Sequence, residues 1–374
     1  MRRRHVGLAL LLTGAILLTG CAELVDIERR ALVVGAGVDL GPAGIGYRVT
    51  VQYPAPEGQG GGGGGGSLGG GGQSSGTGVP RTIGATGVNV GLAMDNLRQE
   101  SDRFLYLGNL SLIAIGMPLA EQGALTPLDF FLRSGEVSES AQIVVTTADA
   151  GALLQQKAPE GVALPLFEYL RQAEVVHVPT SPDPLWRFMA LTYSKSEAAY
   201  APIIAPSTQG QAFTGVGTAL FLRGRMVGTV TGYQTSVLDW LIKKQGFPDG
   251  VVTLPGAAGP VTLRVVGVTK RLQVVSPSDI VLHMRFQAYL REGHGLILDD
   301  KDIRPLEGDA AAQLTSQVRG VLDELQKDGT DVIGLAPRVH ARYPDATADW
   351  PAAFSHLHLG LDVSIRITGG GRET

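Results

Sequence analysis

The sequence predicts an α+β protein in which mixed α/β sheets are flanked by helices and a C-terminal antiparallel sheet is covered by one long helix. Three observations support this fold class. Strand-like and helix-like segments alternate in the N-terminal half, a hairpin followed by a helix comes next, and the last third combines alternating strands with one helical apolar stripe. At 374 residues, 44% of them hydrophobic, the chain is long enough to form three domains.

Residues 1–20 have the composition of a signal peptide. Three consecutive arginines from Arg2 give a positive start, and an apolar run from Val6 to Leu18 follows. The run is about as long as a signal-peptide core and shorter than the roughly 20 residues that a membrane-spanning helix needs. We therefore expect the protein to be exported.

The run Leu18, Thr19, Gly20 and Cys21 resembles a bacterial lipobox and ends in the only cysteine of the chain. The small residues Thr19 and Gly20 suit a peptidase site, and the Cys21 thiol would receive a diacylglyceryl unit. A single cysteine also excludes an intramolecular disulfide and a multi-cysteine zinc site. We predict that acylated Cys21 is an anchor to the lipid bilayer. The alternatives are an ordinary signal peptide that happens to contain a cysteine, or a free buried thiol.

The charge of the chain argues against nucleic acid as a partner. Without the three leader arginines, 28 Lys and Arg face 35 Asp and Glu, a net charge of −7, and no dense basic stretch occurs. Nucleic-acid binding and electrostatic adsorption to a membrane both depend on such a stretch. The acyl chains would hold the protein at the membrane, and the body should lie on its outer face.

We assign residues 21–185 to an N-terminal mixed α/β domain with a glycine-rich segment at 57–78. That segment has almost no apolar side chain to bury, so we expect a flexible loop within the domain rather than a domain linker. The predicted elements are a buried strand in ALVVGAGVDL, an exposed-edge or half-buried strand in GYRVTVQYP, a helix at 90–99, strands at 104–107 and 110–116, helices at 118–123 and 127–133, a strand at 142–147, and helices after Asp149 and Val162.

The run GAGVDLG invites comparison with the glycine fingerprint of dinucleotide-binding folds. Its third glycine is out of register, and a Gly/Pro turn into another strand follows it. A pyrophosphate site needs a helix N-terminus at that place. We therefore predict no nucleotide cofactor.

Residues 186–258 are predicted to form a small middle domain. A helix at 185–194 leads into it, and two strands meet at Arg223 to Arg225, where Gly224 suits a tight turn. A helix from about Tyr233 to Gln245 follows and stops at Gly246. A hairpin and one helix cannot bury a core alone, so this unit should pack against a neighbour.

Residues 259–374 show the clearest periodicity. A strand at 280–290 alternates, and a strand from Val261 changes its apolar phase near Val266, which predicts a β-bulge. A last strand alternates from Leu359 to Ile367. One helix carries an apolar stripe of Ala311, Leu314, Val318, Val321, Leu322 and Leu325. We predict an antiparallel sheet with this helix across its apolar face.

We predict no catalytic, cofactor-binding or metal-binding residues. The sequence contains no G-x-S-x-G elbow, H-E-x-x-H motif, P-loop or EF-hand loop. His356 and His358 would share a strand face and are the sharpest metal candidate, but no carboxylate motif of ligand spacing accompanies them. His283 lies on the polar face of its strand, and the acidic run DDKD at 299–302 is interpreted as a solvated turn.

Several segments in order resemble the Ger(x)C family of spore germination lipoproteins. After the lipobox they are DIERRALVVGAGVDL, YRVTVQYPAP, RFLYLGNLSLIAIGMPLAEQGALTPLDFFLRSGEVSESAQIVVT, GTALFLRGRMVGTVTGYQT, LQKDGTDVIGLAPRVHARYP and HLGLDVSIRITGGG. The most specific combination is the D-V-I-G-L segment from Asp331 to Leu335, interpreted as helical, with Trp350 and the closing strand. Ala22 and Glu23 replace the tryptophan that usually follows the lipidated cysteine, and the glycine-rich loop is an addition.

The resemblance implies a non-enzymatic lipoprotein subunit of a germinant receptor, needed for the response of spores to nutrients. It implies three α/β domains on the outer surface of the spore inner membrane and two polytopic membrane partners, one of them transporter-like. Cys21 is the only position of this chain that the resemblance marks as a functional residue. Two alternatives stay open. A solute-binding lipoprotein of a transport system would need two similar lobes, whereas the three parts here differ, and a surface lipoprotein enzyme would need a catalytic site.

Overall fold

The structure is a computed structural model, and it describes residues 29–55, 78–172, 182–194, 196, 198–207, 212–242, 250–256, 259–293 and 300–368. The strands are β1 (Arg30–Leu32), β2 (Gly35–Leu40), β3 (Tyr47–Ala55), β4 (Gly78–Gly87), β5 (Phe104–Tyr106), β6 (Leu112–Gly116), β7 (Gln142–Thr146), β8 (Asp183–Pro184), β9 (Ala199–Pro206), β10 (Phe213–Leu222), β11 (Arg225–Thr231), β12 (Gly250–Leu254), β13 (Val261–Val274), β14 (Asp279–Glu292) and β15 (His358–Thr368). The α-helices are α2 (Val90–Glu100), α3 (Met117–Gln122), α4 (Leu125–Arg133), α5 (Ala150–Leu154), α6 (Ala163–Gln172), α7 (Leu185–Tyr193), α8 (Tyr233–Ile242), α9 (Asp300–Lys327), α10 (Ala336–His340) and α11 (Trp350–Ser355). Short 3-10 helices are η2 (Pro42–Gly44), η3 (Leu107–Asn109) and η4 (Pro344–Thr347).

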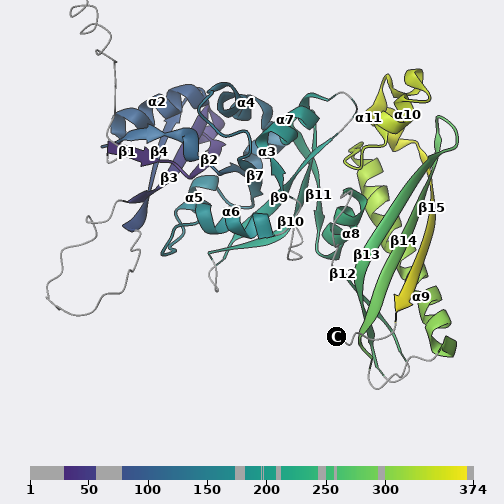
Figure 1. Ribbon diagram of the computed structural model, residues 1–374. Coiled ribbons are helices and arrows are strands. Elements are labelled where there is room, and N and C mark those ends of the chain that lie inside the picture. The colour runs from purple at the N-terminus through teal and green to yellow at the C-terminus, as the bar shows by residue number, and fades with distance from the viewer. Residues whose placement is uncertain are drawn as a thin grey trace, which may run out of the picture.

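A mixed sheet, nine-stranded within the described residues, forms the N-terminal part of the molecule (Figure 1). Its order is β11-β10-β9-β7-β6-β2-β3-β4, with β8 paired to β7. The central strands β2, β6, β7 and β9 run parallel to one another, and antiparallel neighbours extend the sheet at both ends. Helices connect the parallel strands, as crossover connections require. The predicted mixed α/β architecture is confirmed.

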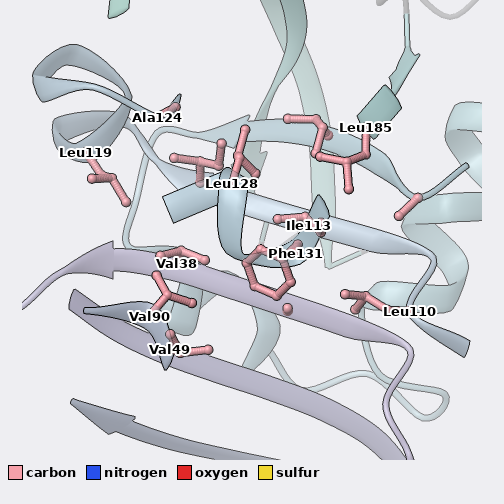
Figure 2. Packing of buried hydrophobic residues seen from close by; sticks show 14 of the residues in the cluster. Val38, Val49, Val90, Leu110, Ile113, Leu119, Ala124, Leu128, Phe131 and Leu185 are labelled. Carbon is pink, nitrogen blue, oxygen red and sulfur yellow. The ribbon is translucent and has the colours of Figure 1, made fainter. Parts of the chain in front are cut away.

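Helices cover both faces of this sheet. On one face, Leu128 and Phe131 of α4 lie against Val38 of β2 and Ile113 of β6 in one hydrophobic cluster (Figure 2). On the other face, α5 and α6 bury a second cluster against β6, β7 and β9. β1 forms a separate parallel pair with β5, so the predicted strand in ALVVGAGVDL is split into β1 and β2.

β3 is an internal strand, which corrects the prediction of an exposed-edge or half-buried strand in GYRVTVQYP. It lies between β2 and β4, and its polar side chains Thr50 and Gln52 are buried. The Gln52 amide donates to the Leu154 carbonyl at 2.6 Å and accepts from the Val162 and Ala163 N–H groups at 2.9 and 2.8 Å. Polar and apolar residues do alternate along β3, but α5 and α6 cover the face that carries the polar side chains. Gln52 can be buried there because it forms hydrogen bonds with backbone groups at the ends of these two helices.

The segment predicted as a middle domain contributes to two sheets. β9, β10 and β11 extend the nine-stranded sheet, whereas β12 pairs with β13. The predicted hairpin turn is confirmed, because Arg223 (φ 51°) and Gly224 (φ 80°) both have positive φ, as a two-residue type I′ turn requires. α8 is described to Ile242, and the predicted helix end near Gln245 lies outside the described residues. The three-domain division at the predicted boundaries stays a prediction.

The C-terminal part is a sheet of order β12-β13-β14-β15 with α9 along one face (Figure 1). β13 and β14 are antiparallel as predicted, and the predicted bulge is present between Val265 and Gly267. β12 is a further strand that the sequence pattern did not predict, and it pairs antiparallel with β13. β15 runs parallel to β14, so the prediction of an all-antiparallel sheet is wrong for the last strand. The connection through α9, α10 and α11 is a crossover that returns the chain to the end of the sheet at which β14 began.

α9 is longer than its predicted apolar stripe and begins at Asp300, inside the acidic run DDKD. The prediction of a turn at 299–302 is therefore wrong for residues 300–302, which belong to the helix. The stripe packs on the sheet as predicted, with Ala310 fully buried and Ala311 partly buried beside it.

One hydrophobic core joins the two sheets. Tyr200, Leu220 and Val230 of β9, β10 and β11 belong to the same cluster as α8, α9 and the inner face of the C-terminal sheet. Within this core, the rings of Trp240 and Phe286 meet edge to face at a centroid distance of 5.1 Å. α5 and α6 cover one end of this face of the nine-stranded sheet. The C-terminal part covers the other end of the same face.

Candidate functional site

The predicted lipid-attachment site lies outside the described residues. Leu18, Thr19, Gly20 and Cys21 all precede Arg29, the first described residue. Acylation of Cys21 accordingly stays a prediction. No helix in the part of the chain that the structure describes is long and apolar enough to cross a membrane.

The histidines singled out from the sequence lie at separate places. His356 follows the end of α11, whereas His358 begins β15, so the expectation that they share a strand face is wrong. The imidazoles of His358 and His283 instead contact carboxylates of register partners on the neighbouring strand, Asp279 at 3.1 Å and Asp362 at 2.7 Å. Among the described residues, no group of three or more His, Cys, Asp or Glu could hold a metal ion.

The D-V-I-G-L segment forms a turn that precedes α10, and the prediction of a helix there is wrong. The reason is the buried side chain of Asp331, whose carboxylate accepts from the Leu335 and Ala336 N–H groups at 3.0 and 2.8 Å. It also accepts from the Trp350 indole N–H at 2.9 Å. An aspartate that bonds to backbone N–H groups a few residues ahead favours a turn or a helix start over a helix interior. Asp331 and Trp350, noted together in the sequence, are in direct contact.

The segment from Asp328 to the Asp331 turn touches the N-terminal sheet at two points. The Asp331 carbonyl accepts from the Ala198 N–H at 3.2 Å, immediately before β9. In β11, Gly228 lies against Asp328, and a Cβ atom at Gly228 would come within 1.9 Å of a carboxylate oxygen of Asp328. Only glycine allows that approach without displacement of the carboxylate. The Asp331 turn is therefore part of the junction between the two sheets.

A cleft of about 750 Å³ opens at this junction. It lies between α7, α8, the end of β13, the Asp331 turn and α10. Its cationic lining residues are Arg187, Lys270, Arg271 and Arg338. The Lys270 ammonium donates to the backbone carbonyls of Trp240 and Leu241 in α8. Arg338 is exposed, so the cleft could accept a carboxylate or phosphate group.

Arg187, another cation that lines the cleft, has a buried partner that sequence reasoning missed. Its Nε lies 3.5 Å from Asp183 Oδ1, and the side chain of Asp183 is 3% exposed. Burial raises the pKa of Asp183 to about 7, although the charge of Arg187 and a hydrogen bond from Tyr200 both lower it. The other carboxylate oxygen has no hydrogen-bond partner among the described groups. The spacing of four residues between Asp183 and Arg187 was the only sequence signal for this pair.

Comparisons with known proteins match nearly all of the described part of the chain. Residues 24–206 match the family model of the spore germination protein N-terminal domain, and residues 216–371 match that of the spore germination B3/GerAC-like C-terminal domain. The putative spore germination protein YfkR of Bacillus subtilis (strain 168) is 26% identical over 257 residues. This match covers 67% of the chain and 64% of YfkR, less than two thirds of that relative's length. The crystal structure of the GerBC protein shares the fold, with a TM-score of 0.56 and 17% identity over 91% of this chain and 99% of that one.

Proposed function

We propose that this chain, which belongs to the Ger(x)C family of spore germination proteins, acts as a non-enzymatic lipoprotein subunit of a germinant receptor. The observation that carries the proposal is that both family domains are present in order, over residues 24–206 and 216–371. The subunit would be required for the germination response to nutrients. Its partners would be two polytopic membrane proteins, one of them transporter-like.

The proposed anchor places the protein on the outer surface of the spore inner membrane. Cys21 precedes Arg29 by eight residues. An extended chain spans at most about 3.6 Å per residue, so eight residues reach roughly 29 Å. Acylation of Cys21 would therefore keep the nine-stranded sheet, which begins a few residues later, close to the bilayer.

The charged groups at the junction are engaged in contacts within the fold. The Asp331 carboxylate is engaged by two backbone N–H groups and one indole N–H, and the Lys270 ammonium is engaged by two carbonyls of α8. Charged groups that are held in this way stabilise the contact between elements. A general acid or base must be able to exchange a proton with a substrate, which these groups are not placed to do.

The cleft at the junction supports a second candidate, a solute-binding lipoprotein of a transport system. Its volume of about 750 Å³ would hold a small nutrient, and its cations would suit an acidic one. Thermal unfolding in the presence of amino acids, sugars and nucleosides separates the two candidates. A bound solute stabilises the protein by RT ln(1 + [L]/Kd), whereas a receptor subunit that does not bind nutrients alone should show no shift.

The variant Cys21→Ala tests the anchor. We expect it to move from the membrane fraction to the soluble fraction of spores and to impair nutrient germination as much as loss of the whole protein. Ala22→Ser is the matched control, since it keeps the acylated cysteine. Full membrane retention of Cys21→Ala would contradict the proposed anchor.

A further inference from the structure

The outer face of the C-terminal sheet, opposite α9, carries several arginines, and three of them lie on a diagonal across adjacent strands. They are Arg271 of β13, Arg285 of β14 and Arg366 of β15, and we call them the arginine stripe. All three are exposed. Residues paired in register share a face of the sheet, and the apolar residues between them face α9.

The register places the arginine stripe on a diagonal. Arg271 is paired with His283, two residues before Arg285 on β14, and Arg366 is paired with Gln287, two residues after it. Diagonal neighbours of this kind lie about 7–8 Å apart across a sheet. The three guanidinium groups therefore form one continuous line across three strands.

Three like charges in a line are not explained by the fold. The whole chain has a net charge of −4, and a solvated sheet face needs only polar groups of mixed sign. Among the described residues, no carboxylate forms an ion pair with any of the three arginines. The two carboxylates of this face, Asp279 and Asp362, contact His358 and His283 instead. Neighbouring like charges on a sheet destabilise it, so a bound anion would relieve the stripe.

Every cation of the stripe is an arginine. The guanidinium group is a planar fork that binds a carboxylate through two parallel hydrogen bonds, which lysine cannot do. In an extended polypeptide, side chains at every second position point the same way and lie about 6.8 Å apart. This spacing matches the diagonal spacing of the arginine stripe.

We propose that the arginine stripe is a docking surface for an extended acidic segment of a partner protein, with Asp or Glu at every second position. A protein is favoured over an anionic bilayer because Asp279 and Asp362 lie on the same face and would be repelled by a uniformly anionic surface. Arg271 also lines the cleft at the junction, whereas Arg285 and Arg366 do not.

Fluorescence anisotropy of a labelled peptide with alternating Glu and Ser tests the proposal on the full-length protein in mild detergent. We expect the triple variant R271Q/R285Q/R366Q to raise the Kd of the peptide by about 10- to 100-fold, because exposed ion pairs contribute about 2- to 5-fold each. The matched triple R98Q/R171Q/R304Q removes the same charge from exposed sites on α2, α6 and α9 and should change the Kd by less than about threefold.

Two further measurements keep the test decisive. A peptide with the same number of Glu residues in one block should bind more weakly than the alternating peptide, and equal binding would overturn the proposal. Phosphatidylglycerol vesicles should not distinguish the stripe variant from the control triple, and selective loss of vesicle binding by the stripe variant would overturn it in favour of a lipid surface. Circular dichroism should show both triples folded, and the single variant R285Q replaces the stripe triple if that triple does not fold.

Discussion

Replacement of Asp183 by asparagine should remove a large part of the pH dependence of stability near neutral pH. Asp183 is almost completely buried and, among the described residues, has only Arg187, at 3.5 Å, as a cationic partner. Burial raises its pKa from 3.8 to about 7 in the folded protein, against the opposing effects of Arg187 and Tyr200. The unfolded chain has the ordinary value.

The sign of the effect follows from proton binding. Between pH 3.8 and about 7 the folded protein holds a proton on Asp183 that the unfolded chain has released. Stability from this group is therefore fully present below pH 3.8 and is lost as the pH rises through about 7. The full loss is about 4 kcal/mol, and about 2–3 kcal/mol of it falls between roughly pH 5 and pH 8.

Guanidinium unfolding of the wild type and Asp183→Asn at about pH 5 and pH 8 measures this loss. The difference between the two proteins in their pH dependence isolates Asp183, because all other groups titrate in both. We expect the asparagine variant to lose about 2–3 kcal/mol less than the wild type across this interval. Arg187→Gln is the second variant, and it should move the transition to higher pH because it removes a charge that lowers the Asp183 pKa. An equal pH dependence in the wild type and Asp183→Asn would refute the reasoning.

Three other perturbations test the junction and the glycine-rich segment. Asp331→Ala should cost about 3–5 kcal/mol in unfolding free energy, because it leaves two backbone N–H groups and the Trp350 indole without their acceptor. A cost below about 1 kcal/mol would contradict the role of Asp331 in holding the junction. Lys270→Met should cost about 1–2 kcal/mol in the same assay, since two backbone carbonyls of α8 lose a cationic donor. Lys327→Met, on the exposed side of α9, should cost almost nothing. Deletion of residues 60–72, a stretch composed almost entirely of glycine, should change stability by less than about 0.5 kcal/mol; a large loss would show that a partner or the fold depends on it.

Features set by neighbouring residues could be predicted from the sequence. The Arg223-Gly224 turn follows from local backbone preference, and the bulge between Val265 and Gly267 follows from a shift in apolar phase along one strand. The long helix α9 was predictable because its apolar stripe keeps a helical period. In each case the signal lies within a few residues of the feature that it predicts.

Features set by distant contacts could not be predicted in this way. The direction of β15 depends on the path of the chain through α9, α10 and α11, and alternation is the same for parallel and antiparallel strands. In the sequence, Gln52 and Asp183 look like surface residues. The Val162 and Ala163 partners of Gln52 lie 110 and 111 residues away in the chain. The partners of Asp183 belong to other elements. The sequence predicts a helix at Asp331, because a turn held by a side-chain carboxylate has no apolar period of its own that would distinguish it.

An affinity pull-down of the lipidated protein from detergent-solubilised spore inner membranes, with mass spectrometry of the recovered proteins, tests the central claim most directly. The receptor proposal predicts that a transporter-like membrane protein and a second polytopic subunit are recovered with it. Recovery of an ATP-driven permease instead would favour the solute-binding alternative. Recovery of the protein alone, even after mild crosslinking, would contradict the claim that it functions as a subunit of a germinant receptor.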